Sequence, residues 1–430
     1  MNLKESNHLL PVLTVVLVLG LAGSLYMYSG TRADLRVALL ESEQTSAELL
    51  SLTENYEMVS AQIEALSLSN SQLETRISEL EAQTDVPPIV EKPDIVLDIS
   101  GVGDVRNVIL LIGDGMGVGQ LTAAEVMNGD DDLVIRSLPY KSLVTTYSLS
   151  GYVTDSAASA TALATGYKTS NGAISTLPNG TVLTTVVEIA EVQGMSTGVV
   201  TTTRVTHATP ACFMAHVNNR GSEYAIAQQV LNSGVDVILG GGSTFFSSLD
   251  PAASGYTLVD TTAEFMGFSS GKVLGLFNGN ADYMSYNDER DPELEPSLAE
   301  MTRKSIELLS DDPDGFFLMI EGGRIDHASH DNDFDATMSE TFAFDDAVLE
   351  ALEYASTRND TLVIVTADHE TGGLLIVGGY PSSGAPQVKW IGDDHTGSMV
   401  PVYAYGPMAE QVIAFKDNTD IGRFLISLVQ

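Results

Sequence analysis

The sequence predicts an α/β fold for residues 104–430, a three-layer helix–sheet–helix sandwich around a mostly parallel sheet. Two observations support this prediction. Short and nearly continuous apolar runs recur along this part of the chain, which is typical of parallel strands that are buried on both faces. Helical segments lie between these runs, so strand and helix alternate as they do in βαβ units. A chain of 430 residues with 44% apolar content is also long enough for a large core and for more than one part.

Six apolar runs are expected to form parallel strands of this sheet. They are "NVILLIGDG" (107–115), "STGVVTTTR" (196–204), "VDVILGGG" (235–242), "GFFLMIEGG" (315–323), "TLVIVTADH" (361–369) and "VPVYAYG" (400–406). Sheets of this kind bind ligands at the carboxyl ends of their strands. The candidate functional residues are therefore sought there.

An apolar run from residue 9 to residue 28 has about the length that crosses a bilayer. Residues 1–30 are therefore predicted to form a transmembrane anchor, and a cleaved signal peptide is the alternative. The anchor would bind the membrane through residues 9–28 and place the remainder outside the cytoplasm, in a periplasm or at the cell surface.

Residues 31–84 carry a heptad pattern that predicts a coiled-coil stalk. With Leu35 at an a position, the seam from Leu49 onward is apolar except for Asn70, and a single Asn at such a position favours a parallel dimer. The alternative is an amphipathic helix that packs on its own domain. Residues 85–103 contain three prolines and are predicted to form a stiff linker to the α/β domain at 104–430.

The charge balance and the cysteine content exclude two classes. The chain has 20 Lys and Arg against 58 Asp and Glu, a formal net charge of −38. A nucleic-acid partner is not expected, because such a protein needs a basic face. Cys212 is the single cysteine, so an intrachain disulfide is impossible.

Residues that can bind metals lie at or just after the ends of the first, fourth and fifth runs, and one more, His395, lies shortly before the sixth. They are Asp114, Glu321, Asp326, His330, Asp368, His369 and His395. Asp326 and His330 are four residues apart, which places both on one face if this segment is helical. Carboxylates and imidazoles at one end of a sheet predict a metal site with Asp and His ligands.

The run "TDSAASATALATG" at 154–166 consists almost wholly of small residues, and Asp155 directly precedes Ser156. A serine at the start of a helix lies beside free backbone N–H groups and the positive end of the helix dipole, which favours an alkoxide and a bound anion. A metal could activate this alcohol. The alternative is a small-residue helix that serves close packing alone.

Together "GDGMG", "TDSAASATALATGYKTSNGAI", "THATPACFMAHVNNR", "MIEGGRIDHASH", "VTADHETGG" and "DDHTGS" resemble the ordered motifs of the alkaline phosphatases over residues 104–430. The resemblance implies two zinc ions and one magnesium ion. It implies that Ser156 is the nucleophile and becomes phosphorylated, and that Arg220 binds the phosphate.

The implied metal ligands fall into three sets. Asp326, His330 and His395 would hold the first zinc, Asp368 and His369 the second, and Asp114 would bridge the second zinc and the magnesium. Thr209 and Glu321 would complete the magnesium shell. His207, His327 and Asp155 would lie beside these ligands without binding metal directly.

Two further segments carry weaker expectations. The interval from Gly373 to Asp393 is short, and it is expected to form only a loop, with Trp390 either at the substrate entrance or packed in the structure. Residues 250–300 are interpreted as a variable peripheral insert.

The sequence therefore predicts a membrane-anchored, dimeric phosphomonoesterase that releases inorganic phosphate from diverse phosphate esters. Two alternatives remain open. One is a related phosphodiesterase of the same superfamily, and the other is an inactive stalked surface protein.

Overall fold

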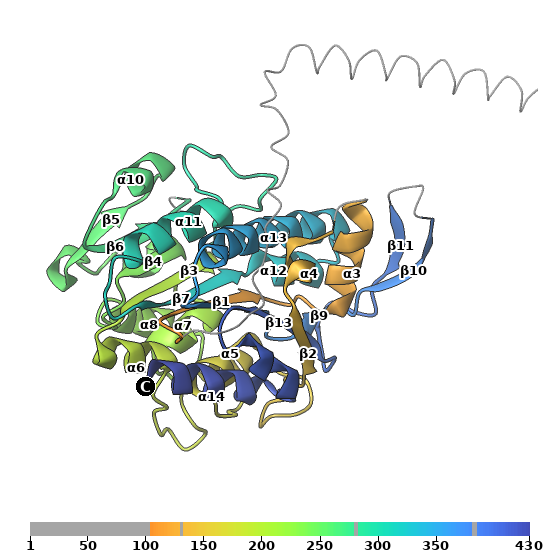
Figure 1. Ribbon diagram of the computed structural model, residues 1–430, viewed down its shortest axis with the longest axis horizontal. Coiled ribbons are helices and arrows are strands. Elements are labelled where there is room, and N and C mark those ends of the chain that lie inside the picture. The colour runs from red at the N-terminus through yellow and green to blue at the C-terminus, as the bar shows by residue number, and fades with distance from the viewer. Residues whose placement is uncertain (1–103, 130–131, 279–282, 381–384) are drawn as a thin grey trace, which may run out of the picture. The chain divides into compact units, whose positions relative to one another are not determined.

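The computed structural model describes residues 104–129, 132–278, 283–380 and 385–430 (Figure 1). The chain divides into two units, residues 1–93 and 94–430, and every described residue belongs to the second. The predicted anchor, stalk and linker at 1–30, 31–84 and 85–103 lie outside the described residues. Within the described ranges, no helix combines the length and the apolar character needed to span a bilayer.

A nine-stranded sheet forms the centre of the described unit (Figure 1). Its order is β2 (Tyr140–Val144), β13 (Val400–Tyr405), β8 (Thr361–Thr366), β1 (Asn107–Gly113), β7 (Phe316–Gly322), β3 (Ser196–Arg204), β4 (Val237–Gly241), β6 (Lys272–Leu276) and β5 (Tyr256–Val259). The strands from β8 to β5 are all parallel. The predicted mostly parallel sheet is confirmed.

All six apolar runs form strands of this sheet, but the prediction that the sixth is parallel is wrong. Strand β13 pairs antiparallel with both β8 and β2. A parallel pair needs a long crossover, usually through a helix. Apart from residues 381–384, which are not described, the chain between β8 and β13 contains only the short strands β9 (Glu370–Thr371), β10 (Leu375–Gly379), β11 (Pro386–Lys389) and β12 (His395–Thr396). It therefore turns back beside β8 in the opposite direction.

Helices cover both faces of the sheet, as the predicted sandwich requires (Figure 1). One layer contains α3 (Val118–Met127), α4 (Val134–Ser137), α11 (Leu298–Leu309), α12 (Arg324–His330) and α13 (Phe334–Ser356). The other contains α5 (Ser156–Thr165), α6 (Val186–Gln193), α7 (Ala208–Met214) and α14 (Asn418–Val429). The remaining helical segments are α8 (Glu223–Val230), α9 (Ser243–Phe246), α10 (Thr262–Gly267), and the 3₁₀ turns η1 (Ala252–Ser254) and η3 (Ala409–Ala414).

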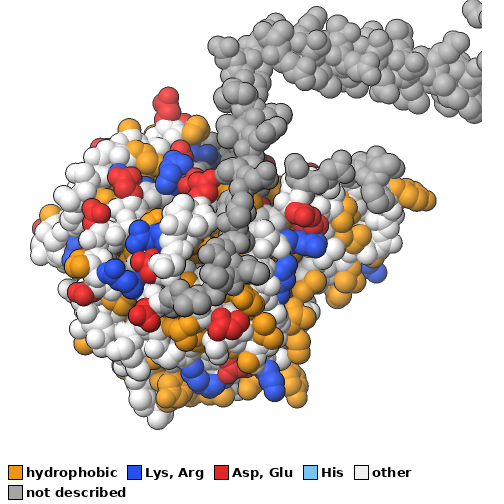
Figure 2. Space-filling model, viewed as in Figure 1, with side chains coloured by type: hydrophobic (Ala, Val, Ile, Leu, Met, Phe, Trp, Pro, Cys, Tyr) orange, Lys and Arg blue, Asp and Glu red, His pale blue; other side chains and the backbone are white. Residues whose placement is uncertain are grey.

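Two predictions about peripheral segments are corrected. Strands β5 and β6 lie inside the segment 250–300 and complete one edge of the main sheet, so this part is not only a peripheral insert. The interval 373–393 holds the antiparallel hairpin β10–β11 instead of a loop alone. Hydrophobic side chains gather on this hairpin in Figure 2, and Val377 and Tyr380 are 58% and 78% exposed. Trp390 is partly buried against the core, and a Cβ on Gly372 would lie 2.5 Å from its ring, so the packing alternative is favoured.

The small residues of α5 allow close helix packing. All ten residues of this helix are buried. A Cβ on Gly422 of α14 would lie 2.2 Å from the carbonyl oxygen of Ala162 and 2.6 Å from the backbone nitrogen of Gly166. The backbone of α14 therefore touches the backbone of α5 at a point where no side chain fits.

We expect Gly422→Ala to lower the free energy of unfolding by about 1–3 kcal/mol, because the added methyl group must push α14 away from α5. Thermal unfolding followed by circular dichroism would measure the effect. Gly267→Ala is the matched control, since a Cβ on Gly267 meets no described atom within 4 Å. A melting temperature of Gly422→Ala equal to that of the control would contradict the prediction.

Candidate active site

Neighbouring parallel strands deliver three buried carboxylates to one edge of the sheet. Asp114 directly follows β1, Glu321 lies near the end of β7, and Asp368 follows β8 by two residues. The register pairs Ile112 with Glu321 on one side and with Thr366 on the other, so these ends are level. The predicted convergence at the carboxyl ends of the strands is confirmed.

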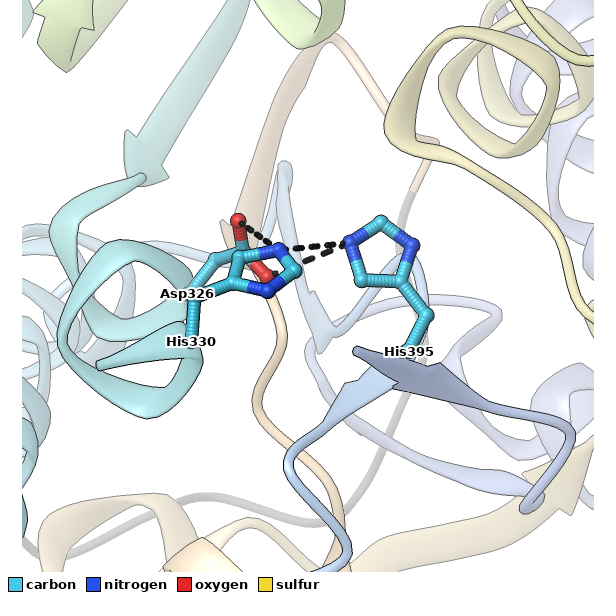
Figure 3. A group of neighbouring side chains, drawn as sticks. All are labelled: Asp326, His330 and His395. Atoms are coloured by element: carbon cyan, nitrogen blue, oxygen red, sulfur yellow. Dashed lines mark hydrogen bonds and ion pairs between the residues drawn. The ribbon is translucent and has the colours of Figure 1, made fainter. Parts of the chain in front are cut away.

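One group that can hold a metal ion consists of Asp326, His330 and His395 (Figure 3). The first two lie four residues apart on α12, and His395 reaches them from β12. The Nε2 atoms of the two histidines are 3.0 Å apart, and they lie 3.4 Å and 3.5 Å from oxygens of Asp326. The Nδ1 atoms contact the backbone carbonyls of Asp393 and Thr154, which leaves both Nε2 atoms directed at one point. Such a fixed ring orientation is common for histidines that bind metals.

The second group is Asp114, Asp368 and His369, all of which are fully buried. Nε2 of His369 lies 3.5 Å from Oδ1 of Asp114 and 3.2 Å from Oδ2 of Asp368. Among the described residues, neither carboxylate oxygen of Asp114 has a hydrogen-bond partner, and Oδ2 of Asp368 has none either. Buried carboxylates need a partner, and a divalent cation supplies one. These residues fit a metal ion.

Asp114 also belongs to a third group, with His207 and Glu321. Within the described part of the chain, Nδ1 of His207 and Oε1 of Glu321 have no hydrogen-bond partner. His207 was expected beside the ligands, and the geometry places it among the possible ligands themselves. Thr209 is buried in α7, and its hydroxyl likewise has no hydrogen-bond partner in the described part, as a free ligand atom would.

Burial and crowding change the pKa values of these groups in the metal-free protein. Burial, followed by the charge of Asp368, raises the pKa of Asp114 well above its usual range. Burial raises the pKa of Glu321 to about 7 and that of Asp368 to about 6. Burial, with the neighbouring His395, lowers the pKa of His369 well below its usual value. Near neutral pH Glu321 is thus partly protonated and the raised pKa of Asp114 favours its protonated form, while this histidine offers a free lone pair.

Metal loading at pH 7 is therefore expected to release about one to two protons per chain, because the metal displaces protons from carboxyl groups whose pKa is raised. The measurement is titration calorimetry with zinc and magnesium in buffers of different ionisation enthalpy. At pH 9 the release should be smaller, since Glu321 and Asp368 are then already ionised. Loading at pH 7 without proton release would contradict the raised pKa values.

Ser156 is the first residue of α5, and Asp155 caps this helix by accepting a hydrogen bond from the backbone N–H of Ala158 at 3.0 Å. The Ser156 hydroxyl lies 3.3 Å from Nε2 of His369, so the hydroxyl and the second metal group meet. The serine side chain is 1% exposed. The alternative that this helix serves packing alone does not account for a hydroxyl directed at a metal group.

Arg220 lies beside the start of the same helix. Its guanidinium donates to Oδ2 of Asp155 at 3.1 Å and lies 3.1 Å from Nε2 of His207. Oδ2 of Asp155 also accepts a hydrogen bond from the backbone N–H of Gly172 at 2.9 Å. Asp155 therefore caps α5 and orients the arginine. Through this one carboxylate, the helix that begins with the predicted nucleophile Ser156 is linked to the predicted phosphate ligand Arg220.

His327 continues this wall of the site. Its ring centroid is 5.5 Å from that of His207 and 4.5 Å from that of Tyr283, and Nδ1 lies 3.1 Å from the guanidinium of Arg324. Sequence reasoning identified His327 but missed Tyr283 and Arg324. Arg324 lies within a quoted motif, but nothing in the sequence indicated that Tyr283 would pack here.

Thr371 is a further site residue that the sequence analysis did not single out. Its hydroxyl donates to Oδ1 of Asp326 and lies 3.3 Å from Nδ1 of His369. One side chain thus contacts two of the candidate metal groups. Its position two residues after His369 was the signal that could have revealed it.

Comparison with known proteins assigns this arrangement to a family. The model of the alkaline phosphatase family matches residues 105–389. Alkaline phosphatase 4 of Bacillus subtilis is 32% identical over 76% of this chain and 89% of that protein. The alkaline phosphatase of Escherichia coli is 34% identical over 74% of this chain and 84% of that protein.

Solved structures agree with these relatives. The alkaline phosphatase from the Antarctic bacterium TAB5 superimposes with a TM-score of 0.70 at 34% identity, covering 76% of this chain and 99% of that one. The cold-active enzyme from Shewanella sp. gives a TM-score of 0.70 at 33% identity, covering 75% of this chain and all of that one. With the converging metal groups and the buried serine, these similarities show that the chain belongs to the alkaline phosphatase family and is a phosphomonoester hydrolase.

Proposed function

We propose that the chain hydrolyses diverse phosphate monoesters through a phosphoserine at Ser156, with two zinc ions and one magnesium ion. The observation that carries this proposal is the 3.3 Å approach of the Ser156 hydroxyl to Nε2 of His369, within a group in which three of the four carboxylate oxygens have no hydrogen-bond partner among the described residues. The nucleophile is thus held against a site that fits a divalent cation.

The assignment of metals follows from the donor types. The first and second groups consist of histidines and aspartates alone. They suit zinc, which binds histidine nitrogen together with a few carboxylate oxygens. The group of Asp114, His207 and Glu321, with the Thr209 hydroxyl, is richer in oxygen and suits magnesium. A TAB5 phosphatase variant in which a histidine is replaced by aspartate has Mg bound in its M3 site, so a related protein can hold magnesium at such a site.

The residues of this chain divide the work of phosphoryl transfer. The guanidinium of Arg220 binds two oxygens of the phosphate through its planar fork. The Ser156 oxygen attacks the phosphorus and gives its proton to solvent, while the bond from phosphorus to the ester oxygen breaks and the alcohol leaves with a proton taken from solvent. Water then attacks the phosphorus of the phosphoserine, the bond to the serine oxygen breaks, and inorganic phosphate is released as the serine oxygen regains a proton. When bound, the zinc ions would lower the pKa of the attacking serine and water and stabilise the departing oxygen.

Broad specificity is part of the proposal. The groups that would bind the substrate are the serine, the arginine and the metal ligands, and all of them are directed at the phosphate. Arg220 is partly exposed, with 29% of its side chain accessible, so the alcohol portion of a substrate would extend towards solvent. A site of this kind reads the phosphate and little of the remainder.

Turnover of p-nitrophenyl phosphate and bis(p-nitrophenyl) phosphate by the full chain, with zinc and magnesium present, tests the proposal. The expected result is fast hydrolysis of the monoester and far slower hydrolysis of the diester. The reverse order would favour the phosphodiesterase alternative. Bound zinc without turnover of either ester would favour the inactive stalked protein.

We further propose that residues 9–28 anchor the protein in a membrane, that residues 31–84 form a parallel dimeric stalk, and that the catalytic domain works outside the cytoplasm. The support is the length of the apolar run and the heptad pattern with Asn70. Sedimentation of the full chain in detergent should give a dimer that becomes a monomer when residues 31–84 are deleted. Release of the intact protein from membranes by high salt would contradict the anchor.

A further inference from the structure

The peptide group between Asp368 and His369 is held at both ends. Its carbonyl oxygen accepts a hydrogen bond from the Ser159 hydroxyl at 2.6 Å. Its N–H donates to Oδ1 of the Asp368 side chain at 2.8 Å, and the N–H of Gly115 donates to the same oxygen at 3.1 Å. Oδ2 has no hydrogen-bond partner among the described residues. The orientation of this peptide therefore decides which carboxylate oxygen of Asp368 stays free for a metal ion.

Two more side chains, Asn418 and Lys168, continue the hydrogen bonding outward from the Ser159 hydroxyl. Nδ2 of Asn418, at the start of α14, donates to the Ser159 hydroxyl at 2.8 Å. Nζ of Lys168 donates to Oδ1 of Asn418 at 2.6 Å. Asn418 is fully buried, Ser159 is 1% exposed, and 11% of the Lys168 side chain is accessible.

The hydrogen bonds from Lys168 through Asn418 and Ser159 to the Asp368 carbonyl can run in only one direction. A lysine ammonium can only donate, so the atom of Asn418 beside it must be the carbonyl oxygen, and the amide nitrogen faces Ser159. The serine oxygen accepts there, and its proton is committed to the Asp368 carbonyl. Aligned hydrogen bonds polarise one another, and a cation at the outer end strengthens each of them.

We propose that Asn418 is a positioning residue for metal binding and catalysis, acting through Ser159 on the Asp368–His369 peptide. This inference rests on the proposed function, because it assigns Asp368 to a metal ion. Ser159 lies one helical turn after Ser156 on α5, so the same hydroxyl fixes the nucleophile helix against the metal-ligand loop. The C-terminal helix α14, which carries no predicted ligand, thereby sets the geometry of the site.

Asn418→Asp tests the direction of the hydrogen bonds from Lys168 through Asn418 and Ser159 to the Asp368 carbonyl, because it changes the donor and acceptor atoms while almost keeping the shape of the side chain. The new carboxylate still accepts from Lys168, but it cannot donate to Ser159. The serine hydroxyl then donates to the carboxylate, and the Asp368 carbonyl loses its donor. A purely structural role predicts little change, since the lysine pair is retained.

The readout is zinc affinity of the metal-free full chain, measured by competition with a chromophoric chelator. We expect the affinity of Asn418→Asp to fall about tenfold or more, as is typical when an outer partner of a metal ligand is lost. We also expect kcat for p-nitrophenyl phosphate to fall with little change in KM. Thr419→Ala is the control at the same helix start. It removes a hydrogen bond to Asp417, the ion-pair partner of Lys168, but leaves the hydrogen bonds between Lys168, Asn418 and Ser159 in place, and it should match the wild type.

The Ser159→Ala background shows whether the effect passes through Ser159. There Asn418→Asp should cause no additional loss of zinc affinity. A full tenfold loss in that background, or an unchanged affinity of the single variant, would overturn the inference. If circular dichroism shows that Asn418→Asp does not fold, Ser159→Ala alone must lose zinc affinity. Wild-type protein that neither binds zinc nor turns over ester would instead contradict the proposed function.

Discussion

Ser156→Ala is expected to lower kcat for p-nitrophenyl phosphate by about 10⁵-fold, because the substitution removes the atom that forms the phosphoserine. The Ser156 hydroxyl lies at the start of α5, 3.3 Å from Nε2 of His369, and it is almost fully buried. Among the described residues, no other hydroxyl lies within hydrogen-bond distance of this nitrogen. The remaining activity would come from direct attack by water on a phosphate that the metals and Arg220 still bind.

Two measurements separate loss of the nucleophile from loss of the site. The variant should bind as much zinc as the wild type, and inorganic phosphate should still inhibit or bind it, since the metal groups and Arg220 are unchanged. Acid quenching of the wild type with radiolabelled phosphate should label the peptide that contains Ser156, and the variant should stay unlabelled. A variant that retains a tenth or more of the wild-type kcat would exclude the phosphoserine mechanism.

The fold was predictable where strands are buried on both faces. Strand β1 is buried at every position, and its apolar run is visible in the sequence. Strand β2 alternates between half-buried and exposed positions at the sheet edge, and β5 has only four residues, so neither gives a continuous apolar run. The antiparallel direction of β13 depends on the short connection before it. The apolar run that forms the strand gives no information about that direction.

The site was predictable where it depends on residue type at strand ends. Asp114, Asp368 and His369 follow apolar runs, and the structure brings them together. The supporting residues Ser159 and Asn418 were not predictable in this way. They are 259 residues apart in the sequence, and they form a hydrogen bond only because α14 packs on α5.

His207 shows how the two kinds of information combine. The resemblance to the alkaline phosphatases implies that it lies beside metal ligands, and the structure adds that its Nε2 lies 3.1 Å from Arg220 while its Nδ1 is buried without a hydrogen-bond partner among the described residues. The imidazole thus belongs to the third candidate metal group and also contacts the predicted phosphate ligand. Residue type alone could not distinguish a ligand from a neighbour of a ligand.

Removal of metal by a chelator is expected to lower turnover by at least roughly 1,000-fold, since the metals supply several kcal/mol of transition-state stabilisation and each 1.36 kcal/mol is a factor of ten. The metal-free protein should also melt at a lower temperature. Asp114, Asp368 and Glu321 are then buried together without a cation, and ligands that bind only the folded state stabilise it.

The order in which metals restore activity tests the assignment of the three groups. Zinc should restore turnover with about two equivalents per chain, and magnesium should raise it further. Magnesium alone should not restore it, because it binds imidazole poorly and four histidines lie in the three groups. Activity that persists when metal analysis finds less than about one tenth of an ion per chain would contradict this mechanism, because the mechanism assigns activation of the serine to a bound metal ion.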